Sequence, residues 1–344
     1  MALPPNGPGQ APLTPPDSAI VAAPVAAIGA GRMGRGIALA FAYAGRTVAL
    51  IDAKPRDSAG FQALAASARA EMRATLTMLA GFALLSEDEV EPMLARIAIL
   101  PRDEAPVALA AAEVIFEGVP ETMEAKRDAF AFLSQHAGPS AIIASTTSTI
   151  LSTDLEPLVA GPERFLNAHW LNPAFLVPLV ELSPCAATAP ETTERLKALL
   201  TGIGKVPVVC AASPGYIVPR IQTLAMNEAA RMVEEGVASA EDIDRATTYG
   251  FGFRFAVLGL LEFIDWGGGD ILFHASAYMA GATGQDRFAA PDVIRDNMEK
   301  GRRGLRDGQG FLDYASMDIP TYQRERLGAF VAMLRHLDAV PPKG

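Results

Sequence analysis

The chain has 344 residues, of which 50% are hydrophobic, so about two domains with a sizeable core are expected. A net charge of −10 and a pI near 5.0 argue against a surface for nucleic acid or for an anionic membrane. No run of about 18 uncharged apolar residues predicts a membrane span.

Residues 1–23 are rich in Pro, Ala and Gly and predict a disordered tail. They lack the basic start and the compact apolar segment of a signal peptide. The two cysteines, Cys185 and Cys210, have neither metal-binding nor redox spacing, so no metal site is expected. A reduced, cytoplasmic compartment is the simple interpretation.

Residues 25–52, VAAIGAGRMGRGIALAFAYAGRTVALID, predict a strand, a glycine-rich turn, a helix, a second strand and an acid. The glycines permit a tight turn, let a pyrophosphate approach and let the helix pack against the strand. Asp52 can accept hydrogen bonds from a ribose and repel a 2′-phosphate, which favours NAD over NADP. Lys54 and Arg56 weaken that preference. The turn expected to bind NAD consists of Gly29, Gly31, Arg32, Met33 and Gly34.

Apolar runs and helical stretches alternate through the first 210 residues, which predicts an α/β domain over residues 24–210 with a mostly parallel, Rossmann-like sheet. The last two neighbouring strands before residue 190 have no helix between them, which predicts an antiparallel hairpin. Strands are predicted over residues 25–28, 47–51, 97–100, 114–116, 141–144, 165–168, 179–182 and 206–209, and helices over 33–44, 60–80, 122–136 and 190–201.

The pattern changes after Cys210, where Ser-Pro-Gly at 213–215 signals a helix start. Helical periodicity continues over residues 216–236, 240–248 and 258–264, and no good strand follows. The sequence therefore predicts a smaller all-α domain over residues 211–344. Apolar helical surface in such a domain often packs against a second copy, so a homodimer is expected.

Among the four histidines, His169 has the context of a catalytic base. It ends a predicted strand at the edge of the sheet where ligands bind. Glu181, in the returning run, would lie beside it and stabilise its protonated form. Oxidation of a hydroxyl requires such a base. The spacing alone fits a purely structural contact equally well, and packed or solvated side chains are expected for His136, His274 and His336.

Two further polar groups lie near the same edge. Ser148 belongs to a Ser-Thr-Thr-Ser cluster whose hydroxyls could hold a substrate oxygen, although helix capping is the common role of such clusters. Glu121 and Lys126 are expected on the nicotinamide side, with a solvated acid and a solvated helix lysine as the alternative.

Seven motifs extend the pattern: GAGRMGRGIA (29–38), EGVPETMEAK (117–126), ASTTST (144–149), HWLNPAFLVPLVEL (169–182), SPGYIV (213–218), EEGVASAEDID (234–244) and GLRDGQGFLDY (304–314). Through them the chain resembles the 3-hydroxyacyl-CoA dehydrogenase family over about residues 24–314. The resemblance implies a Rossmann-like NAD domain followed by a helical dimerisation domain. By position it implies a base at His169 with its partner Glu181, substrate contacts at Ser148 and Asn172, and cofactor contacts at Asp52, Glu121 and Lys126.

The chain departs from the family pattern at several positions. Pro219 stands where the acyl-CoA enzymes usually have a substrate-contacting Asn, and it is expected to disturb the early turns of its helix. Residues 252–262 look more like the branch acting on free hydroxy acids, such as L-gulonate and carnitine dehydrogenases. Arg254 could bind a substrate carboxylate or form a surface salt bridge. Trp170 could form an aromatic wall. Between residues 54 and 96, the CoA-binding helices of the family often carry lysines. Here only Arg69 and Arg73 lie inside the first of these predicted helices, and nearby acidic residues outnumber them, which makes a poor surface for a nucleotide phosphate.

The leading hypothesis is an NAD-dependent dehydrogenase of a 3-hydroxyacyl-type small-molecule substrate, such as 3-hydroxybutyryl-CoA. The alternative substrate is a small carboxylated alcohol without CoA, either a hydroxy acid or a hydroxymethyl aromatic. A lysine-based 3-hydroxyisobutyrate-type dehydrogenase is rejected because no lysine lies between Lys205 and Lys300. A non-enzymatic NAD-binding structural or sensor protein is disfavoured by the intact pair of His169 and Glu181.

Overall fold

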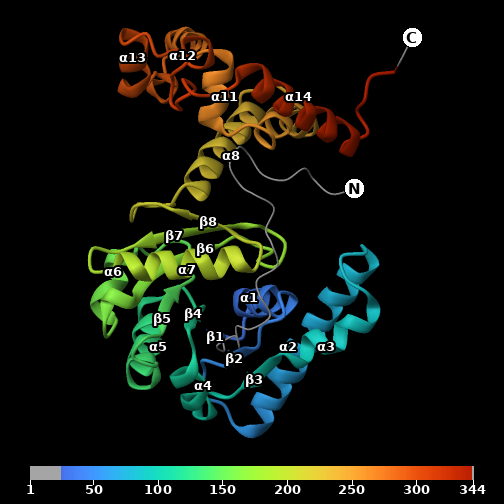
Figure 1. Cartoon of the computed structure of the whole chain (residues 1–344), viewed down its shortest axis with the longest axis vertical. Coiled ribbons are helices and arrows are strands. Elements are labelled where there is room, and N and C mark those ends of the chain that lie inside the picture. The colour runs from blue at the N-terminus through green and yellow to red at the C-terminus, as the bar shows by residue number, and fades with distance from the viewer. Residues whose placement is uncertain (1–24, 343–344) are drawn as a thin grey trace. The chain divides into compact units, whose positions relative to one another are not determined.

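The computed structural model describes residues 25–342, so the tail expected over residues 1–23 lies outside the described residues. The chain divides into two compact units, and the division falls between Ala225 and Met226, inside a helix (Figure 1). The first unit is α/β and the second is helical, which confirms the predicted fold class. The domain boundary expected at residue 210 stays a prediction.

One eight-stranded sheet, ordered β3-β2-β1-β4-β5-β6-β7-β8, forms the centre of the first unit. Every neighbouring pair is parallel except β6 and β7, which are antiparallel, as the missing helix between them predicted. The strands are β1 Val25–Ile28, β2 Val48–Ile51, β3 Ile97–Leu100, β4 Val114–Glu117, β5 Ile142–Ser145, β6 Phe165–Trp170, β7 Leu179–Pro184 and β8 Val206–Val209.

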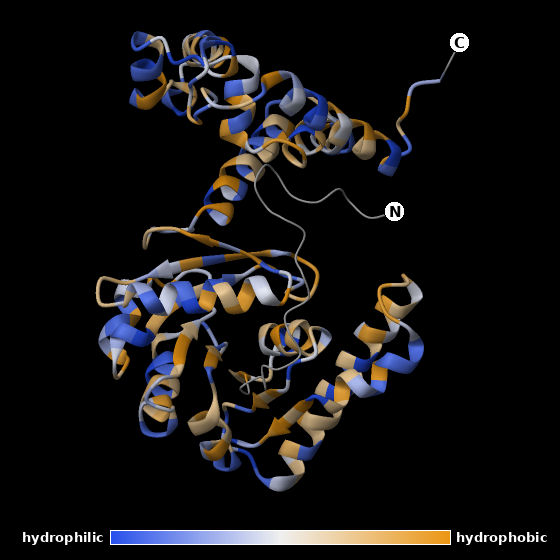
Figure 2. Ribbon diagram, viewed as in Figure 1, coloured by the Kyte–Doolittle hydropathy of each residue, from blue (hydrophilic) through white to orange (hydrophobic). Residues whose placement is uncertain are grey.

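Strand β1 lies between β2 and β4, so the chain leaves it toward one side of the sheet and later returns on the other. Such a reversal of strand order opens a crevice at the carboxyl ends of the strands, where ligands bind. The central strands are buried on both faces and read as continuous apolar runs, as Figure 2 shows by their orange colour.

Helices cover both faces of this sheet. Val25 and Ala27 belong to one apolar cluster with Phe41, whereas Ala26 and Ile28 belong to a second cluster with Phe130. Successive side chains of a strand point to opposite faces, so the two clusters are the two sides of one core. The helices are α1 Arg32–Tyr43, α2 Ser58–Gly81, α3 Val90–Ala95, α4 Pro106–Ala111, α5 Met123–His136, α6 Ser152–Leu155 and α7 Pro190–Gly202.

The second unit is built from helices, and between residues 226 and 342 only isolated bridges within the segment 304–313 have β pairing. Asp265 is buried and accepts hydrogen bonds from the Phe311 and Leu312 amides and the Tyr314 hydroxyl, which holds that segment in place. The helices are α8 Val218–Glu234, α9 Ala240–Ala246, α10 Phe253–Phe255, α11 Leu260–Gly267, α12 Gly269–Thr283, α13 Asp292–Glu299 and α14 Ile319–His336, with a π-helical turn over Thr247–Gly252.

Pro219 does not disturb α8, so that expectation is wrong. It is the second residue of the helix, which starts at Val218. Amides in the first turn of a helix have no intrahelical partner, so a proline there removes no helical hydrogen bond. The departure from the family pattern therefore changes side-chain chemistry rather than the path of the backbone.

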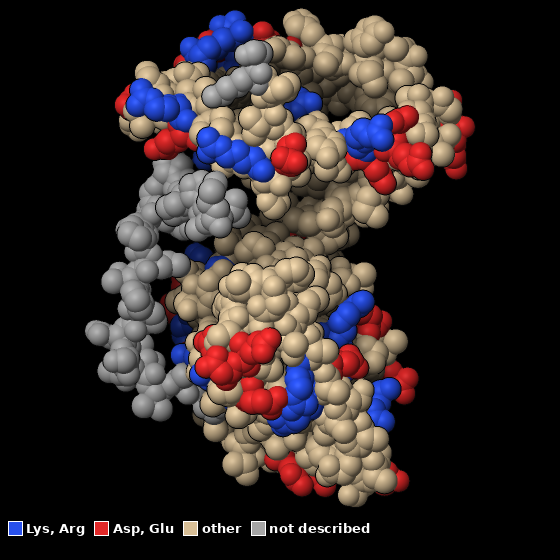
Figure 3. Space-filling view, turned by 90° about the vertical axis from the view of Figure 1, so that its right-hand side faces the viewer, with Lys and Arg blue, Asp and Glu red and all other residues tan. Residues whose placement is uncertain are grey.

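Between residues 25 and 342, no helix combines the length and the apolar character needed to cross a membrane. On the face shown in Figure 3, acidic and basic side chains are interspersed among uncharged ones in each unit.

Candidate active site

The glycine-rich turn between β1 and α1 has the backbone geometry that a phosphate group requires. Gly29 has φ +107°, and a Cβ there would lie 2.5 Å from the Gly118 carbonyl oxygen. A Cβ at Gly34 would collide with the carbonyl oxygen of Gly29. At Gly31, the N-cap of α1, the Cβ position is open and no side chain caps the helix. Free N–H groups facing open space at a helix start are a ready anion site.

Asp52 directly follows β2 and lines a separate cavity of about 390 Å³ together with Phe61 and Phe132. Its carboxylate is already engaged: one oxygen accepts from Arg56 Nε at 2.6 Å and the other from the Lys54 amide at 3.2 Å. Asp52 therefore lies at the end of β2 as predicted, but Arg56 competes for the oxygens that a ribose would use. The two aromatic walls of this cavity were not foreseen, because they come from separate helices.

His169 and Glu181 form a buried pair across β6 and β7. The antiparallel register places them directly opposite each other, and His169 Nδ1 lies 2.8 Å from Glu181 Oε2. The second Glu181 oxygen accepts from the amides of Ile217 and Val218 at 2.9 and 2.8 Å. Because Nδ1 donates to the carboxylate, Nε2 is the nitrogen left to accept a proton. The predicted hairpin thus brings the pair together.

Glu121 holds the loop that carries Ser148. Glu121 Oε1 accepts from the Ser148 amide at 2.6 Å, from Ser148 Oγ at 3.1 Å and from Thr147 Oγ1 at 3.0 Å. Partial burial favours the neutral acid, but these hydrogen bonds and the nearby Lys126 lower the pKa of Glu121 below its ordinary value. Glu121 is therefore a carboxylate that fixes the Ser148 loop.

Lys126 is buried rather than solvated. Its Nζ donates to both oxygens of Glu117, at 2.9 and 3.0 Å, and lies 3.6 Å from Glu121 Oε2. Glu117 is fully buried and also accepts from Ser145 Oγ and the Val119 amide. Sequence reasoning gave Glu117 no role. The available signal was an acid at the end of a strand followed by a lysine on the next helix.

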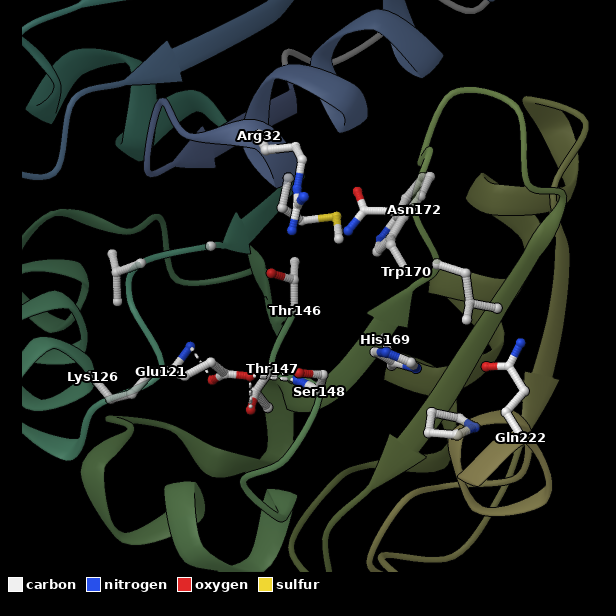
Figure 4. A pocket seen from close by; sticks show the side chains of 15 residues that line it. Arg32, Glu121, Lys126, Thr146, Thr147, Ser148, His169, Trp170, Asn172 and Gln222 are labelled. Carbon is white, nitrogen blue, oxygen red and sulfur yellow. Dashed lines mark hydrogen bonds and ion pairs between the residues drawn. The ribbon is translucent and has the colours of Figure 1, made fainter. Parts of the chain in front are cut away.

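These groups converge on a pocket of about 440 Å³ at the carboxyl ends of the strands. Figure 4 shows Glu121 and Ser148 on one side of His169 and Gln222 on the other, with Arg32 and Asn172 above them. Gln222 was missed because its approach to the pocket depends on how α8 packs. The pocket is lined by Arg32, Met33, Gly118, Val119, Glu121, Lys126, Thr146, Thr147, Ser148, His169, Trp170, Leu171, Asn172, Pro219 and Gln222.

Two candidates have other local roles. Arg254 lies in the second unit, where its Nε donates to the Gly250 carbonyl at 3.0 Å and its guanidinium lies 5.3 Å from the centre of the Phe263 ring. Its binding of a carboxylate stays a prediction. Trp170 lines the pocket, but it is 1% exposed and packs against Phe41 and Phe116, so it serves mainly as core.

The other three histidines lie outside the lining of this pocket. His136 ends α5, His274 lies within α12 and His336 ends α14. The pocket therefore combines one oriented imidazole, a hydroxyl loop and an adjacent anion site. Such an imidazole can take a proton from a bound hydroxyl, and the start of α1 can hold negative phosphates nearby.

The comparisons with known proteins cover nearly all of the described chain. The family model "3-hydroxyacyl-CoA dehydrogenase, NAD binding domain" matches residues 24–213, and "3-hydroxyacyl-CoA dehydrogenase, C-terminal domain" matches residues 215–314.

Similar proteins come from several organisms. The 5-formyl-3-hydroxy-2-methylpyridine 4-carboxylate 5-dehydrogenase of Mesorhizobium japonicum is 30% identical, over 91% of this chain and 98% of that protein. A probable 3-hydroxybutyryl-CoA dehydrogenase of Bacillus subtilis is also 30% identical, over 83% and 95%. The crystal structure of a 3-hydroxyacyl-CoA dehydrogenase from Archaeoglobus fulgidus has a TM-score of 0.74 at 28% identity and covers 93% of this chain and 100% of that one.

Proposed function

This chain belongs to the 3-hydroxyacyl-CoA dehydrogenase family, and we propose that it oxidises the hydroxyl of a 3-hydroxyacyl-type substrate, with His169 as the base. It is an NAD-dependent dehydrogenase acting on hydroxyl groups. The observation that carries the proposal is the 2.8 Å hydrogen bond from His169 Nδ1 to buried Glu181, which leaves Nε2 available inside the pocket.

The residues of the first unit fit NAD. The open space over Gly31 at the start of α1 suits the pyrophosphate, and the cavity beside Asp52 suits the adenosine half. Arg32, Met33, Glu121 and Lys126 line the pocket where the nicotinamide half would lie. When bound, NAD supplies an acceptor for the hydride that leaves the substrate carbon.

His169 Nε2 takes the proton of the substrate hydroxyl as the carbon–oxygen bond becomes a carbonyl. The imidazolium that forms keeps its Nδ1 hydrogen bond to Glu181, whose negative charge stabilises it. Glu181 itself stays fixed because its second oxygen is held by two backbone amides. Ser148 and Asn172 line the pocket beside His169 and orient the reacting oxygen.

A small carboxylated alcohol without CoA is a second candidate substrate, and local contacts favour it. Pro219 lines the pocket with no amide side chain to offer. Arg73 is paired with Glu91 at 2.5 Å, and Arg69 donates to the carbonyl oxygens of Leu94 and Ile97, so a nucleotide phosphate would compete with existing partners of both guanidiniums. The name of the Mesorhizobium relative describes a pyridine carboxylate that carries a formyl group, which is a small carboxylated aromatic without CoA.

A panel of paired alcohols tests the proposal. NADH formation is measured with 3-hydroxybutyryl-CoA, with free 3-hydroxybutyrate and with a hydroxymethylpyridine carboxylate. The proposal predicts kcat/KM for the thioester at least about 10²-fold above that for the free acid, since remote binding energy contributes to catalysis. A preference for either free carboxylate selects the second candidate. No NADH from any of the three contradicts both.

A further inference from the structure

Tyr216 has an unusual backbone and an unusual position. It lies just before α8, is 5% exposed and has φ +45°. A bulky non-glycine residue rarely adopts a left-handed conformation, and such strain persists only where the surrounding structure fixes it. Tyr216 belongs to the SPGYIV motif, for which the sequence suggested no chemical role.

The ring of Tyr216 lies flat against His169. The two ring centres are 4.8 Å apart and the planes differ by 4°. Glu181 holds the Nδ1 edge of the imidazole, so the ring is fixed at one edge and on one face. An aromatic face also attracts a cation, so Tyr216 stabilises the imidazolium that forms when His169 takes a proton.

The hydroxyl of Tyr216 binds the loop that presents Ser148. It donates to the Thr147 carbonyl at 2.8 Å and accepts from Asn167 Nδ2 at 3.1 Å. Asn167 Nδ2 also donates to the Ile150 carbonyl at 3.0 Å, so both ends of the loop 147–150 are connected to Tyr216.

Burial, with the nearby Glu121, Cys210 and Glu181, raises the pKa of Tyr216 well above its ordinary value, although the bond from Asn167 opposes this. The phenol therefore keeps the proton that it donates to Thr147.

The residues after Tyr216 hold the other member of the pair. The amides of Ile217 and Val218 both donate to Glu181 Oε1. Three consecutive residues thus contact the imidazole, its carboxylate partner and the Ser148 loop. A single side chain, that of Tyr216, connects the base to the hydroxyl loop.

We propose that Tyr216 is a positioning residue that sets the His169 imidazole in place relative to the Ser148 loop. The ring acts on the base, and the hydroxyl acts on the loop. This inference rests on the proposed function of His169 and Ser148, because the two groups must meet the same substrate oxygen.

Two substitutions separate the halves of this role. Tyr216→Phe keeps the ring and removes the hydroxyl, so KM is expected to rise roughly 5-fold, the value of about one hydrogen bond, with kcat little changed. Tyr216→Leu also removes the ring, so kcat is expected to fall on the order of 10²-fold through misplacement of the base. Its activity profile should also shift toward lower pH, because the imidazolium loses the aromatic face.

Glu121, Glu181 and Cys210 are unchanged in both variants, so the shift in pH reports on the ring. NADH affinity and the unfolding transition are measured alongside, and Tyr249→Phe, at an exposed position of the second unit, is the matched control.

An unchanged KM in Tyr216→Phe overturns the role of the hydroxyl. An unchanged kcat and pH profile in folded Tyr216→Leu overturns the role of the ring. If the leucine variant does not fold, the KM of Tyr216→Phe still decides the role of the hydroxyl and, with it, the claim that one side chain connects the base to the loop. Full activity of a His169→Asn variant would instead show that the proposed function has failed, whatever the behaviour of Tyr216.

Discussion

Glu181 is the residue whose contacts decide how His169 can act. Both of its oxygens are occupied, one by the imidazole and one by the amides of Ile217 and Val218. A carboxylate in this position stabilises the imidazolium and fixes the tautomer that leaves Nε2 free to accept a proton. The pair therefore combines orientation with charge.

Glu181→Gln tests the charge separately from the shape. Oxidation needs the neutral imidazole as the acceptor of the substrate proton. Removing the negative partner destabilises the imidazolium, so the acid limb of the pH–rate profile is expected to move to lower pH, with kcat reduced on the order of 10²-fold. Steady-state rates across pH measure both. An acid limb that stays in place would argue that Glu181 only supports the hairpin.

We expect Asp52, which is paired with Arg56, to influence the choice between NAD and NADP. Asp52→Ala removes the oxygens that a ribose would use and frees a guanidinium that can bind a 2′-phosphate. The preference for NAD over NADP is expected to fall about tenfold or more, equivalent to ~1.4 kcal/mol. Titration with NADH and NADPH measures it. The double variant Asp52→Ala/Arg56→Met is the control, and it should lose the increased affinity for NADPH. If Asp52→Ala leaves the preference for NAD unchanged, another residue binds the ribose.

Among the elements, the loop between β6 and β7 is held in place by hydrogen bonds from Lys205. Lys205 Nζ donates to the carbonyls of Ala174 and Val177 at 2.7 and 2.8 Å and lies 5.5 Å from the centre of the Trp170 ring. This loop also carries Asn172 into the pocket. Lys205, which directly precedes β8, thus holds a loop that contributes Asn172 to the pocket lining.

Lys205→Met is expected to destabilise the fold by about 1–3 kcal/mol, because buried carbonyls lose their donor. Burial lowers the pKa of Lys205 from 10.5 to about 8. Between about pH 8 and pH 10.5, Lys205 is protonated in the unfolded chain but has lost its proton in the folded chain. The stability that Lys205 contributes therefore rises with pH in this window.

The gap in unfolding free energy between the native protein and Lys205→Met should therefore widen from pH 7 to pH 9. Lys197→Met, which removes only a surface pair with Glu194, is the control. A gap that narrows with pH would contradict this account.

The strands were predictable because each is a short buried apolar run between helices. Strand β6 continues to Trp170, beyond the expected end at residue 168, because pairing with β7 extends it. The short helices α3, α4 and α6 were missed, since six residues or fewer show too little periodicity. In the site, the contact of His169 with Glu181 follows from one hairpin. The role of Tyr216 could not be predicted, because packing between distant segments creates its contacts.

At the scale of the whole molecule, the second unit leaves large apolar side chains exposed. Met226 on α8 is 67% exposed, and Ile271 and Tyr278 on α12 are 63% and 73% exposed. Large exposed apolar patches mark protein interfaces, and these side chains are the candidates for such a patch. The homodimer expected from the sequence therefore stays a prediction with a defined test.

Sedimentation velocity is expected to show a dimer for the native chain. Met226→Asp and Ile271→Asp should each shift the equilibrium toward monomer, because a buried unpaired charge is costly. Val107→Asp changes an exposed apolar residue of the first unit and is the control. A native chain that sediments as a monomer at all concentrations would show that the exposed side chains serve another purpose.

The role of His169 as the base is the central claim, and the turnover of His169→Asn tests it most directly. The substitution removes the proton acceptor and leaves the glycine-rich turn and the Asp52 cavity unchanged. With the best substrate of the panel, kcat is predicted to fall on the order of 10²–10⁴-fold, while NADH affinity and the unfolding transition match those of the native protein. His136→Asn, at the end of α5, should keep native turnover. Near-native turnover of His169→Asn would contradict the account.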